Sequence, residues 1–416
     1  MFALVDGNNF YASCEQFFQP ELRGKPLVVL SNNDGCAIAR SAEAKALGIK
    51  MGHPAHELKD YVRLYGLQMR SANFTLYGDM SARVVSVLRD AGLRVEIYSI
   101  DESFVDLWGI RNRESFCREL RQRIHLWTGI PNCIGIGPTK TLAKLANKLA
   151  KKGQGVVDLA DQAVRDAALL EFPADDLWGV GRKWSAKLAS MDITTAAQLR
   201  DAPTHQILER FGVVLTRTQR ELQGHPCMGI DEVEPDRQQI MVSRSFGARV
   251  EDHDAVAEAI ATFGVLACAK LRKRGLVASG VWVFANTDPF RPELRQHNPS
   301  LMTTLPIATS DTRVVLSMAR RLMQGKLRRG YAYKRAGIAL MDLARPEELQ
   351  GDLFAPPTIG NDALMTALDG INRRFGRGTA GFGASGWQVK PEWRMRQLQL
   401  SPQYTTRLSD IPRVVC

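Results

Sequence analysis

The sequence predicts a mixed α/β protein (α+β class) of several domains, and three observations lead to this prediction. Short runs of β-branched and aromatic residues alternate with amphipathic segments through residues 1–170. A mainly helical stretch containing a Gly-x-Gly turn follows at 171–236. A strongly basic block then combines strand and helix patterns over 237–345. A chain of 416 residues has room for about two to four domains, each with its own core.

Composition excludes several classes of protein. Hydrophobic residues make up 45% and charged residues 24% of the chain, as in globular proteins. No apolar run approaches the roughly 18 residues of a membrane-spanning helix, and the start lacks the basic lead of a signal peptide. Seven cysteines without a CxxC pair predict a reducing, cytoplasmic compartment and no zinc site, and His53 and His56 have no cysteine partner in register.

The first strand covers residues 1–5 and ends at Asp6. Gly7 and the two following asparagines predict a turn, and apolar residues at helical spacing predict a helix beginning near Phe10. Phe10 and Tyr11 then lie four and five residues beyond an acidic strand end. Adjacent aromatics usually belong to a core, but here one of them is a candidate floor for a bound substrate.

A small α/β insert is predicted over residues 21–75. Strands at 27–30 and 36–39 flank a turn at 31–35, and a helix at 41–47 stops at Gly48.

The stretch 95–107, after a predicted helix at 76–88, contains the adjacent acids Asp101 and Glu102 between two strand-like flanks. If this hairpin pairs with the first strand, Asp6 joins them at one end of a sheet. Three close carboxylates repel unless cations lie between them, and two Mg²⁺ ions roughly 3.5–4 Å apart are the usual solution in phosphoryl transfer. Oxygen ligands favour Mg²⁺ over zinc. The spacing alone leaves open a solvated Asp-Glu turn and an unrelated strand-end Asp6.

A helix at 114–127, a strand at 134–137 and a strongly amphipathic helix at 139–152 follow. One stripe of the last helix is apolar, and the other consists of Lys140, Lys144, Lys148 and Lys151. Such a stripe is usually a solvated face, but these lysines could reach a triphosphate. The order of elements predicts a split βαβ sheet with helices on one face.

The turn at Gly179 and Gly181, followed by Lys183, exposes backbone N–H groups ahead of a helix. Such a turn binds phosphates without reading sequence, although an ordinary helical hairpin would look the same.

The block 237–345 carries 18 Lys and Arg against 8 Asp and Glu, nearly all of the net charge of +11. Concentrated positive charge indicates a phosphate-backbone binder, the alternative being a merely basic surface. The strands are expected at 240–246, 277–285, 301–306 and 336–343, and the helices at 254–274 and 311–323. We expect a sheet whose exposed face is basic, as a DNA groove requires. Little regular structure is expected over 372–416.

Three motifs together resemble the Y-family translesion DNA polymerases, and within them the UmuC branch, which includes the catalytic subunit of bacterial DNA polymerase V. They are Asp6 with Asn9-Phe10-Tyr11-Ala12-Ser13, Ser99-Ile100-Asp101-Glu102, and Lys140-Thr141-Leu142-Ala143-Lys144. The branch is indicated by the opening Met1–Leu4, by Ser31–Cys36 and by Leu400–Arg407.

The resemblance implies a right-hand polymerase with four parts and a tail. These are a palm (1–20 and 76–170), small fingers (21–75), a helical thumb (171–236), a little finger (237–345) and a C-terminal tail (346–416). It implies error-prone, template-directed DNA synthesis past lesions in an SOS-type response, by two-metal transfer of nucleotides to a primer 3′-hydroxyl.

The resemblance also implies roles for individual residues. Asp6, Asp101, Glu102 and the carbonyl of Gly7 would hold two Mg²⁺ ions. Tyr11 would exclude the 2′-hydroxyl, with Phe10 beside it, and Lys151 would hold the triphosphate. Gly179, Gly181, Lys183 and Arg244 would contact DNA. Gln350, Leu353 and Phe354 would dock on a sliding clamp.

Three positions depart from the family pattern. Ala42 and Lys45 stand where a Tyr and an Arg are frequent, so the phosphate contacts here are expected either to be looser or to come from Arg40 instead. Gly7 stands where an aromatic residue is frequent. The implied partners are primer-template DNA, deoxynucleotides, the clamp, a UmuD′-type dimer and a RecA-type recombinase filament, with no membrane. The alternatives are a non-catalytic DNA-binding scaffold and another palm-fold enzyme such as a nucleotide cyclase.

Overall fold

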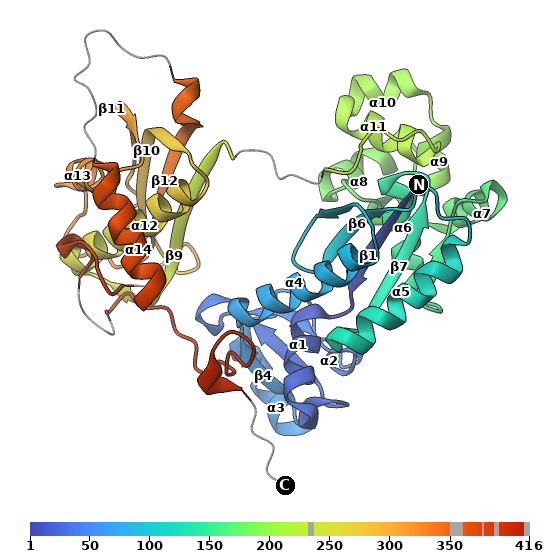
Figure 1. Cartoon of the computed structure of the whole chain (residues 1–416), viewed down its shortest axis with the longest axis horizontal. Helices are drawn as coiled ribbons and strands as arrows, with labels where there is room; N and C mark the ends of the chain where they lie inside the picture. The colour runs from blue at the N-terminus through green and yellow to red at the C-terminus, as the bar shows by residue number, and fades with distance from the viewer. Residues whose placement is uncertain (232–236, 350–360, 377, 387–390, 412–416) are drawn as a thin grey trace. The chain divides into compact units, whose positions relative to one another are not determined.

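The structure is a computed structural model that describes residues 1–231, 237–349, 361–376, 378–386 and 391–411 (Figure 1). The chain forms two compact units. The first holds residues 1–31, 35–234 and 399–416, and the second holds 32–34 and 235–398.

A five-stranded sheet in the order β5-β6-β1-β7-β8 forms the centre of the first unit. Its strands are β1 (Phe2–Gly7), β5 (Val95–Ile97), β6 (Glu102–Asp106), β7 (Asn132–Gly137) and β8 (Val156–Asp158). β1 runs antiparallel to both of its neighbours, and β7 and β8 are parallel. The three strand regions predicted here are confirmed, whereas the short β8 was not predicted.

Helices cover both faces of this sheet. α4 (Phe74–Asp90) and α5 (Arg113–Thr128) pack on the face that carries Val5. α6 (Lys140–Ala150) packs on the opposite face, against Leu4. The prediction of helices on one face is therefore wrong.

Two glycines of β7 explain how α6 approaches the sheet so closely. A Cβ on Gly135 would lie 2.0 Å from the backbone nitrogen of Asn147, and one on Gly137 would lie 2.8 Å from that of Ala143. The side chain of Asn147 donates to the carbonyls of Leu4 (3.2 Å) and Cys133 (2.8 Å). Glycine at these positions is therefore a packing requirement of α6.

A three-stranded sheet in the order β3-β2-β4 lies within residues 27–71. Its strands are β2 (Leu27–Leu30), β3 (Ala37–Arg40) and β4 (Gln68–Ser71), and the nearby helices are α1 (Phe10–Phe18), α2 (Ala42–Ala46) and α3 (Lys59–Tyr65). The predicted β2–β3 hairpin is confirmed. β4, parallel to β2, and α3 were not predicted.

Five short helices follow β8, and they share a core with α6. They are α7 (Gln162–Glu171), α8 (Arg182–Ala189), α9 (Ala196–Asp201), α10 (Thr204–Phe211) and α11 (Val213–Leu222). The buried carboxylate of Glu221 accepts from the backbone N–H (2.9 Å) and hydroxyl (2.6 Å) of Thr141. Negative charge at the N-terminus of α6 complements the helix dipole, so α11 is anchored there.

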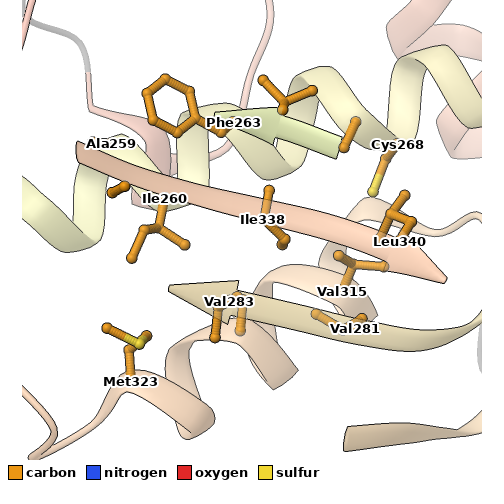
Figure 2. Close-up of a cluster of buried hydrophobic side chains, with 14 of the residues drawn as sticks. Ala259, Ile260, Phe263, Cys268, Val281, Val283, Val315, Met323, Ile338 and Leu340 are labelled. Atoms are coloured by element: carbon orange, nitrogen blue, oxygen red, sulfur yellow. The ribbon is translucent and has the colours of Figure 1, made fainter. Parts of the chain in front are cut away.

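The second unit is a four-stranded antiparallel sheet, in the order β11-β10-β12-β9, with two helices on one face. The elements are β9 (Gln239–Val250), α12 (His253–Lys273), β10 (Val277–Thr287), β11 (Ser300–Thr309), α13 (Thr312–Met323) and β12 (Tyr333–Ala344). Figure 2 shows the apolar core between them, with Phe263 of α12 near Ile338 of β12. The predicted order of strands and helices is confirmed.

The open face of this sheet is apolar at its centre. Trp282 and Phe284 alternate with core residues of β10, and Met302 lies opposite Trp282. Arg335 lies over the ring of Phe284, 5.5 Å from its centroid. The prediction of a basic sheet face is therefore wrong at the centre of the sheet.

The C-terminal region contains structure that the sequence did not predict. α14 (Asp362–Phe375) joins the second unit through Asp369, which forms two hydrogen bonds with Arg272. Ser401 and Tyr404 are buried in the first unit. Little regular structure was expected over 372–416, and this expectation is wrong for the end of α14, whereas Ser401 and Tyr404 are buried without belonging to a helix or strand.

Single-turn 3₁₀ helices lie at Pro20–Leu22, Asn32–Asp34, Ala55–Leu58, Ala174–Asp176, Pro346–Glu348, Gly383–Ser385 and Leu408–Asp410. Among the described helices, none has the length and apolarity needed to span a bilayer. The six cysteines that the structure describes carry free thiols. His53 and His56 both lie near the carboxylate of Glu57 (3.4 and 3.8 Å).

Candidate active site

Three carboxylates meet at one end of the five-stranded sheet. The antiparallel register of β1 and β6 places Asp6 directly opposite Glu102. The N–H of Gly7 donates to the carbonyl of Asp101 (2.8 Å), which extends the pairing by one residue. Strand pairing therefore brings together acids that are 95 positions apart, and Asp6 is not an unrelated strand end.

The turn before β6 is held by Ser99. Its hydroxyl accepts from the backbone N–H of Asp101 (3.3 Å) and of Glu102 (3.0 Å), and it donates to Oδ1 of Asp101 (2.7 Å). A serine hydroxyl that binds the backbone two and three residues later stabilises a tight turn. The Ser-x-Asp-Glu spacing therefore positions both acids, of which Asp101 is exposed.

Two lysines, one in α6 and one in the turn that follows it, pair with Glu102 and Asp6. Lys151 Nζ lies 2.6 Å from Asp6 Oδ2, and Lys144 Nζ lies 3.1 Å from both carboxylate oxygens of Glu102. Lys144 also lies over the ring of Tyr98, 4.4 Å from its centroid. The predicted lysine stripe thus faces the carboxylates rather than only solvent.

Burial raises the pKa of Asp6 to about 6. The positive charge and hydrogen bond of Lys151 oppose this shift, while the negative charges of Glu102 and Asp101 add to it. A buried carboxyl surrounded by other acids favours a nearby cation, so the electrostatics of this sheet end suit a cationic ligand.

The donor set fits a hard divalent cation, although it is not a preformed cage. Within the described residues, no group of three or more acidic, histidine or cysteine side chains is close enough to hold a metal ion. The oxygens of Asp6 and Glu102 face the two ammonium groups instead. Carboxylate oxygens are ligands that hard divalent cations take, so the type of donor suits such an ion, while Lys144 and Lys151 pair with two of the carboxylates in this structure.

A cleft of about 380 Å³ opens beside the acids. Asp6, Asp101, Arg40, Lys45 and Lys151 all line it. Burial lowers the pKa of Lys45, and the nearby charges of Arg40 and Lys151 lower it further. Cations that repel one another across a cleft favour a polyanionic ligand.

Arg40 also favours a polyanionic ligand. Its Nη1 donates to the carbonyl of Ile49 (2.9 Å), whereas its buried Nε finds no acceptor among the residues that the structure describes. Lys45 Nζ donates to Oδ1 of Asn9 (2.5 Å). Ala42, one residue beyond the N-cap of α2, offers only a methyl group.

The floor of the cleft is aromatic. Tyr11 stacks on Tyr77, with ring centroids 4.4 Å apart and planes 16° from parallel, and Phe74 meets it edge-on. Phe10 is buried, and a Cβ on Gly7 would lie 2.9 Å from its ring. Glycine at position 7 therefore leaves room for Phe10 beneath the cleft.

The remaining predicted residues lie outside this cleft. Gly179, with φ +87°, turns the chain toward α8, while Gly181 at the N-cap of α8 and Lys183 are exposed. Arg244 belongs to β9 of the second unit, opposite Ala336. Gln350, Leu353 and Phe354 lie outside the described residues.

Sequence reasoning missed two sets of buried charges near the site. Lys140 is buried and pairs with Glu96 (2.5 Å), although its helical spacing grouped it with solvated lysines. Glu15 of α1 is buried and accepts hydrogen bonds from Tyr77 of α4 and from Ser401. No signal in the sequence links Glu15 to a residue 386 positions later.

Comparison with known proteins gives matches along nearly the whole chain. Residues 5–148 match the model of the impB/mucB/samB family, and 237–353 match the C-terminal domain of that family. Residues 362–414 match a domain of unknown function.

Several curated proteins are similar over almost their full length. Protein UmuC of Salmonella typhimurium is 44% identical, with 100% of each chain covered. Protein MucB of Escherichia coli is 41% identical over 99% of each chain. DNA polymerase IV of Moorella thermoacetica is 29% identical over 90% of this chain and 93% of that protein.

The fold is similar to solved Y-family DNA polymerases. A chimera of Dbh and Dpo4 aligns with a TM-score of 0.65 at 20% identity, covering 83% of this chain and 100% of that one. An insertion ternary complex of Dbh DNA polymerase aligns with a TM-score of 0.56 at 19% identity.

Proposed function

Since the chain belongs to the impB/mucB/samB family of Y-family DNA polymerases, we propose that it extends primers on damaged DNA templates. The observation that carries this proposal is the register of β1 and β6, which sets Asp6 opposite Glu102 beside a cleft lined by three cations. Carboxylates beside cationic side chains suit a reaction between a nucleoside triphosphate and a hydroxyl nucleophile.

Asp6, Asp101, Glu102 and the Gly7 carbonyl would hold two Mg²⁺ ions, which supply charge neutralisation and activation of the primer hydroxyl. Before they bind, Lys144 and Lys151 keep the acids of the site from repelling one another. Lys151 is 42% exposed, so its ammonium group can turn from Asp6 toward a triphosphate, and the metal ions would then balance the buried carboxylate of Asp6.

Arg40, Lys45 and Lys151 would bind the triphosphate. The guanidinium of Arg40 offers several N–H donors, and its Nε has no acceptor among the described residues. Lys45 stands where the family pattern has an arginine. Tyr11 would pack beneath the sugar and exclude a 2′-hydroxyl, since its ring is fixed by the stack on Tyr77. Phe10 would support Tyr11 from the core.

The division into palm, fingers, thumb, little finger and tail, at the boundaries given above, is part of the proposal. The basic segment 237–345 would hold duplex DNA through its phosphates. The turn at Gly179 and Gly181, with Lys183, would add backbone N–H contacts to phosphate, and Arg244 a charged one. Small fingers that contact the new base pair little would tolerate damage at the cost of fidelity.

Further partners are also proposed. The peptide with Gln350, Leu353 and Phe354 would dock on a sliding clamp. A UmuD′-type dimer and a RecA-type filament would assist synthesis in an SOS-type response, in a bacterial cytoplasm. Primer extension past an abasic site, with and without these partners, measures their contribution.

The test of the polymerase itself is Asp101→Ala. Extension of a primer in Mg²⁺ should be abolished while primer-template binding is kept, because Asp101 is an exposed acid at the end of the sheet. Asp90→Ala is the matched control, since Asp90 is exposed at the last turn of α4. Extension retained by Asp101→Ala would falsify the assignment.

A further inference from the structure

The segment Gln399–Tyr404 attaches to the first unit beside β4. Gln399 exchanges two hydrogen bonds with Ser71: its carbonyl accepts from the Ser71 N–H (3.0 Å), and its N–H donates to the Ser71 hydroxyl (3.0 Å). Leu400 forms a parallel bridge with Ser71. The segment therefore contacts the three-stranded sheet through one isolated bridge at the edge formed by β4.

Asn73 ties the same segment to the start of α4. Its Nδ2 donates to the carbonyl (3.1 Å) and hydroxyl (3.0 Å) of Ser401 and to the carbonyl of Pro402 (3.1 Å). Its Oδ1 accepts from the N–H of Leu76 and so caps the helix. One buried side chain thus fixes both the segment and the helix that carries Tyr77.

Ser401 reaches a buried acid. Oε1 of Glu15 accepts from the hydroxyl of Ser401 (3.0 Å) and from that of Tyr77 (2.7 Å). Glu15 and Tyr77 are 0% exposed, and Ser401 is 6% exposed. Burial raises the pKa of Glu15, while the two hydroxyl donors oppose the shift. Removal of either donor leaves a buried acid with one bond fewer.

Tyr404 closes the attachment. Its ring stacks on Phe18 with centroids 4.6 Å apart and planes 6° from parallel, and its hydroxyl accepts from Gln19 (2.9 Å). Tyr404 belongs to the same apolar cluster as Phe10 and Tyr77. The segment is thus part of the core beneath the cleft.

The acid that Ser401 reaches also holds the ring on which Tyr11 lies. Tyr77 is bonded to Glu15 at its hydroxyl and stacked on Tyr11 at its face. We propose that residues 399–404, within the region that matches a domain of unknown function, position Tyr11 through Glu15 and Tyr77. The segment thereby sets how strictly the cleft rejects ribonucleotides.

This inference rests on the proposed role of Tyr11 in sugar selection. Ser401, Glu15 and Tyr77 are positioning residues, since they act on the nucleotide only through Tyr11. A sugar gate works by contact distance, so a small displacement of its ring changes the penalty for a 2′-hydroxyl more than it changes deoxynucleotide binding. The expected signature is a change of selectivity rather than a general loss of rate.

Tyr77→Phe and Ser401→Ala test the proposal in the full chain. Each removes one donor to Glu15 and keeps the size of its residue nearly unchanged. The ratio of kcat/KM for a deoxynucleotide over the matching ribonucleotide should fall by about 3- to 10-fold, the range of one net hydrogen bond. The kcat/KM for the deoxynucleotide itself should fall by a smaller factor than the ratio does.

Two controls separate the outcomes. Ser409→Ala makes the same substitution at an exposed position of the same terminal region and should leave the ratio unchanged. Tyr11→Ala should collapse the ratio. If Tyr11→Ala collapses the ratio while Tyr77→Phe and Ser401→Ala leave it unchanged, the segment does not position Tyr11. The polymerase assignment would still stand.

Equal losses with both sugars would show that the segment only stabilises the fold, which would overturn the inference. An unchanged ratio in Tyr11→Ala would remove the gate itself and the inference with it. Thermal unfolding of each variant checks that the measured proteins are folded.

Discussion

The two compact units bury charge very differently. Among the described residues of the first unit, four charged side chains are buried: Asp6, Glu15, Lys140 and Glu221. In the described part of the second unit only Asp311 is buried, and it caps α13 and pairs with Arg313 (2.7 Å). Buried charge is costly and needs partners, and in the first unit one of these groups, Asp6, lines the cleft.

Two of these acids show that burial alone does not decide a pKa. Burial raises the pKa of Glu15, which has two hydroxyl donors on one oxygen. Burial also acts to raise the pKa of Asp311, but Arg313 and the backbone N–H groups of Arg313 and Asn361 lower it more. The first unit therefore holds a buried carboxyl, Glu15, whose ionised form is disfavoured. In the second unit, the partners of Asp311 favour its ionised form.

The largest expected effect separates catalysis from stability. Asp6→Asn keeps the shape of the side chain but removes its charge, so primer extension should fall by at least about 10³-fold. Stability should change little, because the freed Lys151 is 42% exposed. Single-nucleotide extension and thermal unfolding measure the two quantities.

Asp311→Asn is the counterpart in the second unit. It should leave the chemical step intact and lower the free energy of unfolding by about 1–2 kcal/mol, through loss of the Arg313 pair and a weaker cap. Extension by Asp6→Asn within tenfold of the unmodified chain would contradict the contrast between the units.

The buried Lys140–Glu96 pair gives the next effect. Lys140→Met leaves Glu96, whose side chain is 13% exposed, without its cation, and should cost about 3–5 kcal/mol of unfolding free energy. Adding Glu96→Gln should recover part of this, because the amide can still accept from the Asp231 N–H. Urea unfolding of the single and double variants measures the coupling, and additive losses would contradict it.

The sequence predicted the features that depend on residues close together in the chain. The strands around Asp6 and Asp101 and the helices α12 and α13 of the second unit follow from residue pattern, and they are confirmed. The roles of the site residues remain predictions. The prediction that helices cover one face of the first sheet was wrong, since α6 packs on the face opposite α4 and α5, where Gly135 and Gly137 leave room for it.

The burial of Lys140 and the aromatic open face of the second sheet depend on partners distant in the chain. The same holds for Ser401, whose partner Glu15 is 386 positions earlier. Periodicity states which residues share a face, but it does not state what covers that face.

The pH dependence of stability should have opposite signs for the two buried acids. The pKa of Glu15 is raised on folding, so its contribution is present below its ordinary value of 4.5 and is lost as the pH rises through the folded value. The pKa of Asp311 is lowered, so its contribution is present above its ordinary value of 3.8 and is lost as the pH falls.

Urea midpoints measured against pH should therefore diverge for Glu15→Gln and Asp311→Asn. The first variant should gain stability relative to the unmodified chain as the pH rises from about 4 toward neutrality. The loss of stability of Asp311→Asn relative to the unmodified chain should be smallest at acidic pH. Parallel curves for the two variants would show that the donors around Asp311 do not offset its burial.

The smallest effect comes from a second lysine of α6. Lys148 pairs with Asp176 at 2.5 Å, as short as the Lys140 pair, but the two side chains are 39% and 44% exposed. Water and salt screen such a pair, so Lys148→Met should change the free energy of unfolding by less than about 1 kcal/mol, and less still in 1 M salt. Lys140→Met and Lys148→Met thus compare one substitution on one helix at equal contact distance. If the two losses were equal, distance rather than burial would govern the cost, and the contrast between the units would have to be explained without desolvation.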